Sequence, residues 1–376
     1  MPAPRIFRLT ALTDPALAGF DDVIDVRSPA EHADDHLPGS INLPVLDDAQ
    51  RAQVGTIHKQ ESPFAARRIG GALVAANTAR HVAGPLADRD GSWQPLVHCW
   101  RGGQRSGAFA TILAQIGWRV SILDGGWKTW RRLVLDQVEQ RGPGSPVLVV
   151  DGNTGSAKTA ILERLAARGV QVIDLEGLAN HRGSLFGAMP GGQPPQKLFE
   201  SRLAMTLARL DPARPVVVEA ESSRIGTLAV PRAMWRALCA APRVRLDVPV
   251  AARAAYTADV YADTVSEPGR VDDAVQALSR LHPATRIAEW RGLVRQQDWA
   301  TLAEALMREH YDPRYRSHRD RFQAAEIGQV ELPSLDPAAQ YAAAARIEAV
   351  LDSARFRNFA AAESQGRAPA ASCSRD

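Results

Sequence analysis

The sequence predicts two consecutive α/β domains, each built around a mainly parallel sheet. Short apolar runs alternate with helical patterns along most of the chain, and polar residues follow directly after several of these runs. That placement is typical of α/β sheets, whose functional residues lie at the carboxyl ends of strands. The 376 residues suffice for about two domains, and 45% hydrophobic with 23% charged residues is an ordinary globular composition.

Charge and cysteine content exclude several classes of protein. A formal net charge of +3 gives no support for a protein that binds nucleic acid through an overall basic surface. Three widely spaced cysteines (Cys99, Cys239 and Cys373) fit neither a disulfide framework nor a zinc ligand set, and we expect Cys239 in a core. No stretch approaches the roughly 18–20 apolar residues of a membrane span. We therefore expect a cytoplasmic protein without membrane association.

The first domain is predicted at residues 1–136, followed by a linker at residues 137–146, where charge, Gly and Pro are mixed. A strand, loop, helix and second strand follow one another in this domain as a βαβ unit. The predicted strands are Asp22–Arg27, Pro95–Cys99 and Arg119–Leu123, and the predicted helix is Ser106–Gly117.

The second domain is predicted at residues 147–310, with a helical extension at 311–358 and a disordered tail at 359–376. From Val250 onward the pattern is mostly helical. The predicted strands are Pro146–Val150, Val170–Leu175 and Pro215–Glu219. The predicted helices are Ala160–Arg168, Leu198–Leu210, Ala274–Leu281, Ala284–Val294, Asp298–Glu309 and Pro337–Phe356.

A cysteine follows the predicted strand at Pro95, at the start of a loop rich in glycine and arginine. Backbone N–H groups can converge there on an anion, next to the positive end of the following helix. The same field favours a thiolate, which makes Cys99 a candidate catalytic nucleophile. The candidate anion-binding loop comprises Arg101, Gly102, Gly103, Gln104, Arg105 and Ser106.

Four motifs in order resemble a rhodanese domain, which is a doubly wound α/β fold: Asp25–His32, His36–Pro44, the Cys99 loop and Leu123–Trp127. The resemblance implies that the cysteine carries a chalcogen atom, as a persulfide or its selenium equivalent. It also implies that Asp25 and Arg27 support the active loop from a neighbouring strand. The spacing from Cys99 to Arg105 equally suits a cysteine-dependent phosphatase, although no carboxylate follows the loop as an obvious general acid. Both alternatives stay open.

A second phosphate-binding motif follows the strand that ends at Val150. It matches a Walker A loop except that Ala157 occupies the position of the last glycine, whose conformational freedom the loop normally uses. Backbone N–H groups would wrap phosphate oxygens, Lys158 would bridge the terminal phosphate, and Thr159 could hold magnesium. The predicted diphosphate-binding residues are Gly152, Gly155, Ser156, Ala157, Lys158 and Thr159.

Charged and polar residues after the next two predicted strands form a second candidate cluster in the P-loop domain. An acid there could bind magnesium through water or position a nucleophile, and Glu219 is placed like a Walker B acid. Charged caps at the strand ends are the simpler alternative. The cluster comprises Asp174, Glu176, His181, Arg182, Ser184, Lys197, Glu219 and Arg224.

A rhodanese domain followed by a P-loop domain resembles the tRNA 2-selenouridine synthases. The specific matches are Cys99–Ser106, the P-loop, Leu175–Ser184, Gln193–Glu200, Glu219–Gly226 and His310–Tyr315, with departures at Ala157, Ala220 and Ser223. The resemblance implies that 2-thiouridine at the tRNA wobble position is S-geranylated with geranyl diphosphate. Selenium from selenophosphate then replaces the S-geranyl group.

That chemistry implies two co-substrates and no tightly bound cofactor, with a selenophosphate-supplying enzyme as a further partner. We expect the Lys158 loop to bind the diphosphate and the Cys99 loop to handle selenophosphate. Two other functions stay open: a sulfurtransferase or phosphatase fused to an ATP-using P-loop kinase, and a non-catalytic anion-sensing module. The Walker motif alone does not distinguish ATP from geranyl diphosphate.

The predicted tRNA contacts lie where aromatic residues and arginines interleave near residue 315, a pattern that suits phosphate contact and base stacking. A solvated helix flank is the alternative explanation. The candidates are Tyr311, Arg314, Tyr315, Arg316 and Arg319.

Overall fold

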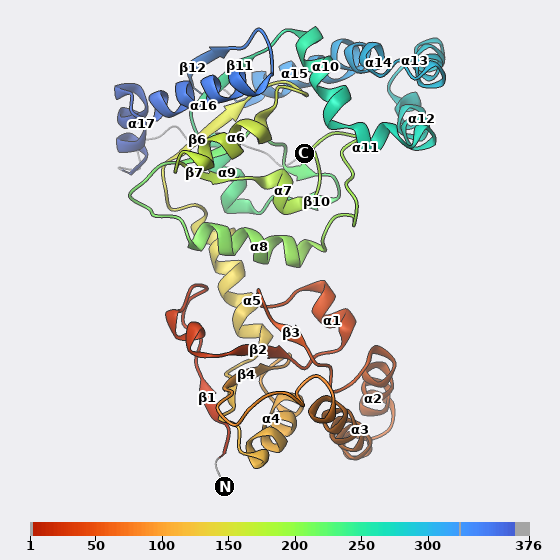
Figure 1. Ribbon diagram of the computed structural model, residues 1–376, viewed down its shortest axis with the longest axis vertical. Helices are drawn as coiled ribbons and strands as arrows, with labels where there is room; N and C mark the ends of the chain where they lie inside the picture. The colour runs from red at the N-terminus through yellow and green to blue at the C-terminus, as the bar shows by residue number, and fades with distance from the viewer. Residues whose placement is uncertain (1–2, 323–324, 365–376) are drawn as a thin grey trace. The chain divides into compact units, whose positions relative to one another are not determined.

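Five parallel strands form the sheet of the first structural unit, which comprises residues 3–140 and 194–209 (Figure 1). The computed structural model describes residues 3–322 and 325–364 of the chain. Because β2 and β4 are adjacent and parallel, their carboxyl ends meet at one edge of the sheet. The strands, in sheet order, are β1 (Arg5–Phe7), β5 (Ser121–Leu123), β4 (Pro95–His98), β2 (Asp22–Asp25) and β3 (Ile41–Asn42).

Helices cover this sheet and bury its apolar side chains. Phe109 and Leu113 of one helix pack against Ile24, Val97 and Ile122 of the strands, all of them buried. The helices preceding β4 were not predicted, because their sequence mixes arginines and glycines with the apolar residues. The helices are α1 (Pro29–Asp34), α2 (Asp48–Gln60), α3 (Pro63–Ala83), α4 (Gln104–Ile116) and α5 (Trp127–Leu135), with a short 3-10 helix at Pro15–Gly19.

Helix α8 (Gln196–Ala208) belongs to the first unit, although the sequence on both sides of it belongs to the second. Trp130 of α5 donates a hydrogen bond from Nε1 to Ser201 Oγ at 3.2 Å, and both side chains are buried. Arg131 of α5 forms an ion pair with Glu200. The prediction of one continuous domain over residues 147–310 is therefore wrong for this helix, because its buried face fits α5.

The predicted linker is also partly helical. Residues Asp136–Arg141 form a π-helical turn that continues α5, and Val138 within it is fully buried. Val134 and Val138 are spaced by one helical turn, so the apolar stripe of α5 continues into this segment. The Gly and Pro residues of the segment had suggested a linker.

A second sheet of five parallel strands organises the second unit, which comprises residues 141–193 and 210 onward. Its central strand β6 is buried at every position, as its apolar sequence predicts. The strands, in sheet order, are β12 (Glu326–Glu331), β11 (Arg243–Asp247), β6 (Val147–Asp151), β8 (Val216–Glu219) and β7 (Gln171–Ile173), and a hairpin is formed by β9 (Arg224–Ile225) and β10 (Leu228–Ala229).

Two of these strands, β11 and β12, were missing from the sequence prediction. In β11, Val244 and Leu246 pack in the core, whereas Arg243 and Arg245 alternate with them. The sequence therefore lacks the continuous apolar run by which the other strands were predicted. Strand β12 and the following helix α16 (Pro337–Leu351) both contribute to the same core, and Val330 is the buried residue of the strand. The predicted extension at 311–358 is therefore part of the second unit rather than an appendage.

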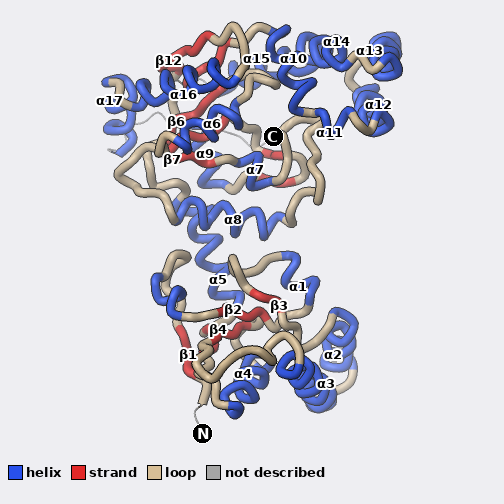
Figure 2. Tube along the Cα trace, in the orientation of Figure 1, coloured by secondary structure: helices blue, strands red, loops and turns tan. Residues whose placement is uncertain are grey.

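The remaining helices of the second unit include α10 to α14, which follow one another without an intervening strand and are drawn in blue, as all helices are, in Figure 2. This group has its own core around Trp290, Leu302 and Leu306. The bounds are α6 (Lys158–Ala167), α7 (Leu175–Ala179), α9 (Arg232–Ala240), α10 (Val250–Val260), α11 (Ala262–Val265), α12 (Pro268–Ala277), α13 (Ala284–Gln296), α14 (Trp299–Leu306), α15 (Asp312–Phe322) and α17 (Ala354–Ser364), with a 3-10 helix at Leu278–Arg280 and a π-helical turn at Met307–Tyr311.

The structure differs from the prediction for the C-terminal tail and agrees with it for Cys239. Helix α17 continues through residues 359–364, where a disordered tail was expected, and Cys373 lies outside the described residues. Cys239 is buried on α9, as expected. Within the described part of the chain, no helix is long and apolar enough to cross a membrane.

The placement of α8 predicts a stability effect. Ser201→Ala removes the acceptor of the buried Trp130 N–H, so we expect unfolding of the first unit to become easier by about 1–3 kcal/mol. Chemical denaturation followed by tryptophan fluorescence measures this change. Arg202→Ala, at an exposed position of the same helix, is the control and should cost less than about 0.5 kcal/mol. Equal effects of the two substitutions would contradict the placement.

Candidate functional sites

The loop that begins at Cys99 connects β4 to α4 and turns tightly on Gly102. This glycine has a φ of +65°, and a Cβ there would lie 2.5 Å from the carbonyl oxygen of Leu123. No other residue type fits this position without displacing backbone. The loop can therefore bring its N–H groups close together directly before α4 begins at Gln104.

The structure favours ionisation of the Cys99 thiol. Its Sγ lies 3.2 Å from Ser106 Oγ. Burial alone would raise the pKa of Cys99, but hydrogen bonds from Ser106 and from the backbone of Arg101, together with the charge of Arg105, bring the pKa below its usual value of 9.0. A thiolate at this position is a competent nucleophile.

Cys99 lines a large pocket between its loop and the helices α2 and α3. The pocket contains about 1820 Å³ of space not filled by atoms, part of it open to solvent. Arg101 is exposed at this pocket. The pocket can thus admit an anionic substrate to the thiol. The cationic or ionisable lining residues are Arg51, His58, Lys59, Arg67, Arg101 and Arg105.

Arg105 does not offer a free charge to the loop. Its Nη1 donates to Glu31 Oε2 at 2.6 Å, and Arg51 lies 3.8 Å from the same carboxylate. Burial would raise the pKa of Glu31, but the hydrogen bond and charge of Arg105 hold it below its ordinary value. Binding of an anion by both loop arginines stays a prediction: Arg101 is exposed, whereas Arg105 is paired with Glu31.

Glu31 also bears on the phosphatase alternative. Sequence reasoning found no carboxylate at the loop, because Glu31 is 74 residues from Arg105 in the chain. Its lowered pKa means that it is ionised at neutral pH. A general acid must carry a proton, so Glu31 is poorly suited to that role.

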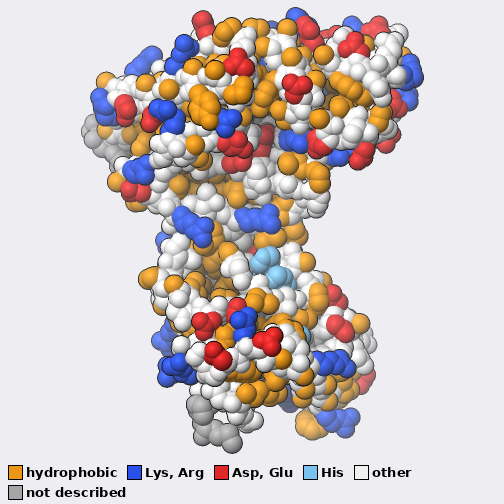
Figure 3. Space-filling model, in the orientation of Figure 1, with side chains coloured by type: hydrophobic (Ala, Val, Ile, Leu, Met, Phe, Trp, Pro, Cys, Tyr) orange, Lys and Arg blue, Asp and Glu red, His pale blue; other side chains and the backbone are white. Residues whose placement is uncertain are grey.

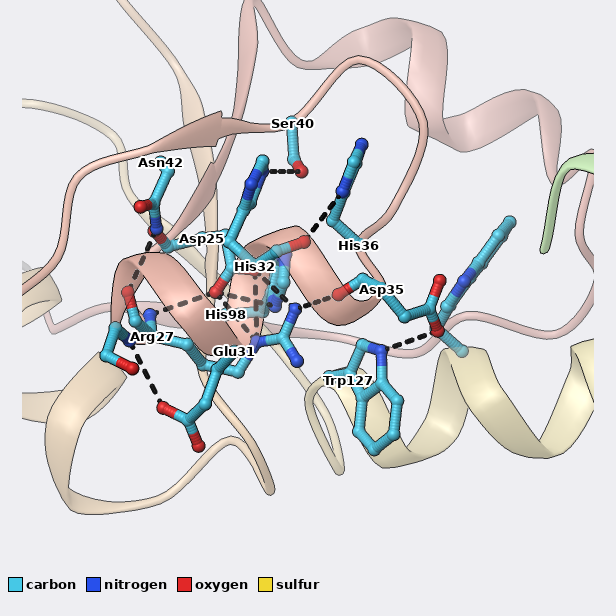
Figure 4. Close-up of polar contacts among 12 residues, drawn as sticks. Asp25, Arg27, Glu31, His32, Asp35, His36, Ser40, Asn42, His98 and Trp127 are labelled. Atoms are coloured by element: carbon cyan, nitrogen blue, oxygen red, sulfur yellow. Dashed lines mark hydrogen bonds and ion pairs between the residues drawn. The ribbon is translucent and has the colours of Figure 1, made fainter. Parts of the chain in front are cut away.

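Asp25 and Arg27 form a buried pair at the end of β2, where Asp25 neighbours His98, the residue before Cys99 (Figure 4). The two are nearly inaccessible and are joined at 2.6 Å between Arg27 Nη2 and Asp25 Oδ2. The same Nη2 donates to the carbonyl oxygen of Asp35 at 2.6 Å, and the guanidinium lies 5.1 Å from the Trp127 ring centroid. Burial lowers the pKa of His98 to about 4, so it is neutral beside this pair.

In the second unit, the P-loop connects β6 to α6 and packs against two other segments. Gly155 has a φ of +80°, and a Cβ there would lie 2.4 Å from Thr257 Oγ1 and 2.7 Å from Met307 Cε. Ala157 has a φ of +58°, so it adopts the left-handed conformation for which the motif normally uses glycine. The loop thus keeps its shape despite this departure, and the Ala157 methyl is buried in the core.

The Lys158 side chain is buried, and its ammonium group contacts the P-loop. Its Nζ donates to the carbonyl oxygen of Gly152 at 3.1 Å. Burial would lower the pKa of Lys158, but electrostatic interactions with Tyr315 and with three glutamates raise it above its ordinary value. Lys158 is therefore a permanent ammonium. The three glutamates are Glu176, Glu219 and Glu221.

These glutamates form a compact acidic cluster around Thr159. Its hydroxyl lies 3.1 Å from Glu176 Oε2 and 3.4 Å from Glu219 Oε2, and the Glu176 N–H donates to Glu219 Oε1 at 2.9 Å. Burial is the main cause of the raised pKa of each carboxyl group; repulsion from Glu176 raises the pKa of Glu219 and Glu221 further, whereas the repulsion acting on Glu176 comes from Asp174. Glu221 was not among the predicted site residues, although it is two residues beyond Glu219.

The fit of this cluster to magnesium is partial. The described residues contain no group of three His, Cys, Asp or Glu side chains arranged to hold a metal ion. Thr159 and Glu219 offer a hydroxyl and a carboxylate, and Mg²⁺ commonly uses one or two such ligands together with water and substrate phosphates. These two residues would hold the ion once a phosphate ligand is bound.

Asp174, Arg224 and Lys197, which were also predicted for this cluster, make contacts outside the acidic group around Thr159. Asp174 caps α7 by accepting from Gly177 N at 2.7 Å, and Arg224 is exposed and donates to the Thr227 carbonyl. Lys197 belongs to α8 in the first unit, where its Nζ lies 2.5 Å from Asp34 Oδ2. Its assignment to the P-loop cluster is therefore wrong, because α8 packs with the other unit.

The segment after α7 keeps its polar residues near the P-loop. Ser184 Oγ lies 2.9 Å from the hydroxyl of Tyr261, and Arg182 pairs with Asp263 at 3.0 Å. His181 is buried, which lowers its pKa. These contacts tie the segment to α10 and α11, so that it forms one wall of the site.

Arg253 is a further residue that sequence reasoning missed. It is 4% exposed, donates to the carbonyl oxygen of Thr154 in the P-loop at 3.0 Å, and forms two hydrogen bonds with Asp312. In a chain so rich in arginine, nothing in the sequence distinguishes it. It anchors the P-loop to α10 and α15.

A polar pocket opens beside the P-loop, with about 1470 Å³ of space not filled by atoms, part of it open to solvent. Thr154, His181 and Glu221 line it together with Arg314 and Arg319 of α15. Charged groups of both signs thus face a space large enough for a nucleotide.

The predicted tRNA contacts divide into two groups. Arg314 and Arg316 are exposed. Tyr311 and Tyr315 are half-buried, line the polar pocket beside the P-loop, and have pKa values raised by burial; their contact with tRNA stays a prediction. Arg319 donates to Asn153 at 2.6 Å. Basic and acidic side chains are interspersed on the face drawn in Figure 3, without one broad basic area.

Two family models match the chain: a Rhodanese-like domain over residues 11–133 and a tRNA 2-selenouridine synthase AAA domain over residues 145–282. Three curated proteins, each named tRNA 2-selenouridine synthase, show how far the similarity extends. The chain is 39% identical to that of Aeromonas salmonicida over 252 residues, which is 66% of this chain and 67% of the relative.

The match to the protein of Chromohalobacter salexigens is 34% identical over 337 residues, covering 82% of this chain and 91% of the relative. The match to that of Verminephrobacter eiseniae is 32% identical over 343 residues, covering 83% and 93%. Together with the two parallel sheets, these matches confirm the predicted fold class of a rhodanese-like and a P-loop domain.

The geometry at Cys99 predicts the pH dependence of its alkylation. Because the thiolate reacts, the rate should rise with pH to a midpoint below 9.0, and Ser106→Ala should move this midpoint upward by removing a hydrogen bond that lowers the pKa. Mass spectrometry of the Cys99 peptide after timed iodoacetamide treatment gives the rate. Thr111→Ala, at an exposed position of the same helix, is the control and should leave the midpoint unchanged. An unchanged midpoint in Ser106→Ala would refute the assignment.

Proposed function

The chain belongs to the tRNA 2-selenouridine synthase family, and from this premise we propose that it converts wobble 2-thiouridine in tRNA to 2-selenouridine in two steps. Each unit carries one step, S-geranylation at the P-loop and selenium insertion at the Cys99 loop. The observation that supports this division is the presence of two separate anion-binding loops, each with its own buried reactive group. No tightly bound cofactor is required.

In the first step, the sulfur of 2-thiouridine attacks the allylic carbon of geranyl diphosphate. A C–S bond forms, the C–O bond breaks, and diphosphate leaves. The N–H groups of the P-loop and the ammonium of Lys158 stabilise this leaving anion. Thr159 and Glu219 would hold a Mg²⁺ ion, which would supply further positive charge when bound.

The same step releases a proton from N3 of the base, because the S-alkylated base is neutral without it. Glu221 lines the polar pocket beside the P-loop. Its pKa is raised by burial and by the neighbouring Glu176, which makes it a stronger base than an ordinary carboxylate. We assign the N3 proton to Glu221.

In the second step, selenium from selenophosphate replaces the S-geranyl group. A C–Se bond forms, the C–S bond breaks and geranyl thiol leaves, after which water cleaves the P–Se bond and releases phosphate. Alkylation makes the sulfur a better leaving group, which explains the order of the steps. Cys99, Arg101 and the loop N–H groups handle the selenium donor, which a selenophosphate-producing enzyme must supply.

The division of labour predicts opposite defects in two variants. Lys158→Ala should lower S-geranyl formation by about 10²–10³-fold, as loss of one group that stabilises the leaving anion commonly does. Cys99→Ser should still form S-geranyl-2-thiouridine but should not convert it to 2-selenouridine. Nucleoside mass spectrometry of the treated tRNA measures both products.

Lys59→Ala serves as a matched control for the first substitution, because it removes a lysine of the other unit. Formation of 2-selenouridine at the normal rate by Cys99→Ser would contradict the assignment of the second step to the Cys99 loop. Unchanged S-geranyl formation by Lys158→Ala would contradict the assignment of the first step to the P-loop.

We place part of the tRNA-binding surface on the exposed arginines of α15, Arg314 and Arg316. Removing each arginine that binds a phosphate should make the slope of log affinity against log salt shallower by about 0.7–0.9. Fluorescence titration of tRNA at several salt concentrations with the double variant Arg314→Ala/Arg316→Ala tests this. Arg295→Ala, at an exposed position of α13, is the control. Identical slopes for the double variant and the wild type would rule out phosphate binding by these two side chains.

A further inference from the structure

The peptide groups of the P-loop determine which of its N–H groups can face an anion. A peptide group is planar and trans, so its C=O and its N–H point in opposite directions. An anion bound in the loop needs carbonyl oxygens that are turned away from it and held there. The Asn153 carbonyl is held within the loop, where it accepts from Ser156 N at 3.2 Å and from Ser156 Oγ at 2.8 Å. The next carbonyl, that of Thr154, is held from outside the loop.

Arg253 of α10 holds the Thr154 carbonyl. Arg253 is almost fully buried, and its Nη1 donates to the Thr154 oxygen at 3.0 Å. Its Nε donates to the Val248 carbonyl at 3.2 Å, while Nη1 and Nη2 donate to the two carboxylate oxygens of Asp312 at 3.0 and 2.7 Å. A planar guanidinium bound at three places has one orientation, so the Thr154 carbonyl is fixed toward α10.

The same contact orients the N–H of Gly155, which shares a peptide group with the Thr154 carbonyl. Gly155 lies directly against α10, because a Cβ on it would be 2.4 Å from Thr257 Oγ1 and 3.1 Å from the Arg253 carbonyl oxygen. With the Thr154 carbonyl facing α10, the Gly155 N–H points away from this helix, toward the other side of the loop.

Asp312 belongs to a face of α15 that packs on the P-loop. Asp312, Tyr315 and Arg319 are spaced i, i+3 and i+7, so they lie on the same side of the helix. Arg319 Nη2 donates to Asn153 Oδ1 at 2.6 Å, and the Lys158 ammonium lies 5.8 Å from the centroid of the Tyr315 ring. The Asp312 carboxylate is thus held close to the loop by two further contacts of its own helix.

We propose that Arg253 is a positioning residue of the P-loop: held by Asp312, it orients the Thr154–Gly155 peptide group so that the Gly155 N–H faces a bound phosphate. The inference rests on the proposed function, because it takes the P-loop to be a diphosphate site, and it applies to any ligand that presents a diphosphate there. Donors that are fixed before the ligand arrives need no reorganisation when it binds. Without Arg253, the peptide group could rotate and turn the Thr154 carbonyl oxygen, which repels an anion, toward the phosphate.

Arg253→Lys tests this role, because a lysine keeps the positive charge but lacks the planar fork that binds Thr154 and Asp312 together. We expect its affinity for inorganic diphosphate to fall about tenfold, the effect of losing one hydrogen bond to a charged group. Arg308→Lys is the matched control. Arg308 is an exposed arginine of the same unit, paired with Glu304, and its substitution should leave the affinity unchanged.

A double-mutant cycle tests whether Asp312 acts through Arg253. Asp312→Asn removes the charge that holds the guanidinium and should weaken diphosphate binding less than Arg253→Lys does. The double variant should bind no more weakly than Arg253→Lys alone, because Asp312 acts on the ligand only through Arg253.

Isothermal calorimetry of the full-length enzyme with inorganic diphosphate gives the affinities, and urea denaturation gives the stability of each variant. Hydrogen exchange of the peptide that contains Gly155, measured by mass spectrometry, reports on the N–H itself. Saturating diphosphate should slow this exchange in the wild type and in Arg308→Lys more than in Arg253→Lys. A purely structural role of Arg253 would lower the urea midpoint but leave the affinity and this protection unchanged.

The outcomes separate this inference from the proposed function. If diphosphate binds the wild type and Lys158→Ala weakens it, but Arg253→Lys binds as tightly as the wild type, the positioning role is overturned while the function stands. The same conclusion follows if the losses of the two single variants add in the double variant. If the wild type does not bind inorganic diphosphate, the proposed function of the P-loop fails and the positioning role fails with it.

Discussion

The chemistry of the second unit depends on the balance between the buried ammonium of Lys158 and the three carboxyl groups around it. Glu219 is completely buried and Glu176 and Glu221 are half-buried, and burial together with repulsion from neighbouring carboxylates raises the pKa of all three. The diphosphate that we propose for the P-loop would add more negative charge, so protons or a magnesium ion would have to accompany it. Substrate binding and the protonation of Glu221 are thereby coupled.

At the Cys99 loop, hydrogen bonds rather than nearby cations provide much of the stabilisation of a negative charge. Its nearest arginine, Arg105, is committed to Glu31, so Ser106 and the backbone N–H groups provide much of the stabilisation of the thiolate. The buried pair of Asp25 and Arg27 is rigid for a similar reason: Arg27 is fully paired with Asp25 and the Asp35 backbone. Donors that are already held in place lose little on binding an anion, which suits the selenophosphate binding that we propose for this loop.

Features that depend on neighbouring residues in the chain could be predicted, whereas features that depend on contacts between distant residues could not. Both loops follow apolar strands within a few residues, so their motifs and their edge of the sheet could be predicted. The position of α8, the pairing of Arg105 with Glu31, and the anchoring of the P-loop by Arg253 join residues far apart in the chain. Strand β11 was hidden because Arg243 and Arg245 alternate with its core residues.

Geranylation is proposed to precede selenium insertion, and the two steps are proposed to occur at different loops. The most direct test incubates the wild-type enzyme with 2-thiouridine tRNA and withholds one co-substrate at a time, followed by nucleoside mass spectrometry. Without selenophosphate, S-geranyl-2-thiouridine should accumulate; without geranyl diphosphate, no 2-selenouridine should form. Formation of 2-selenouridine from selenophosphate alone would contradict the proposed order.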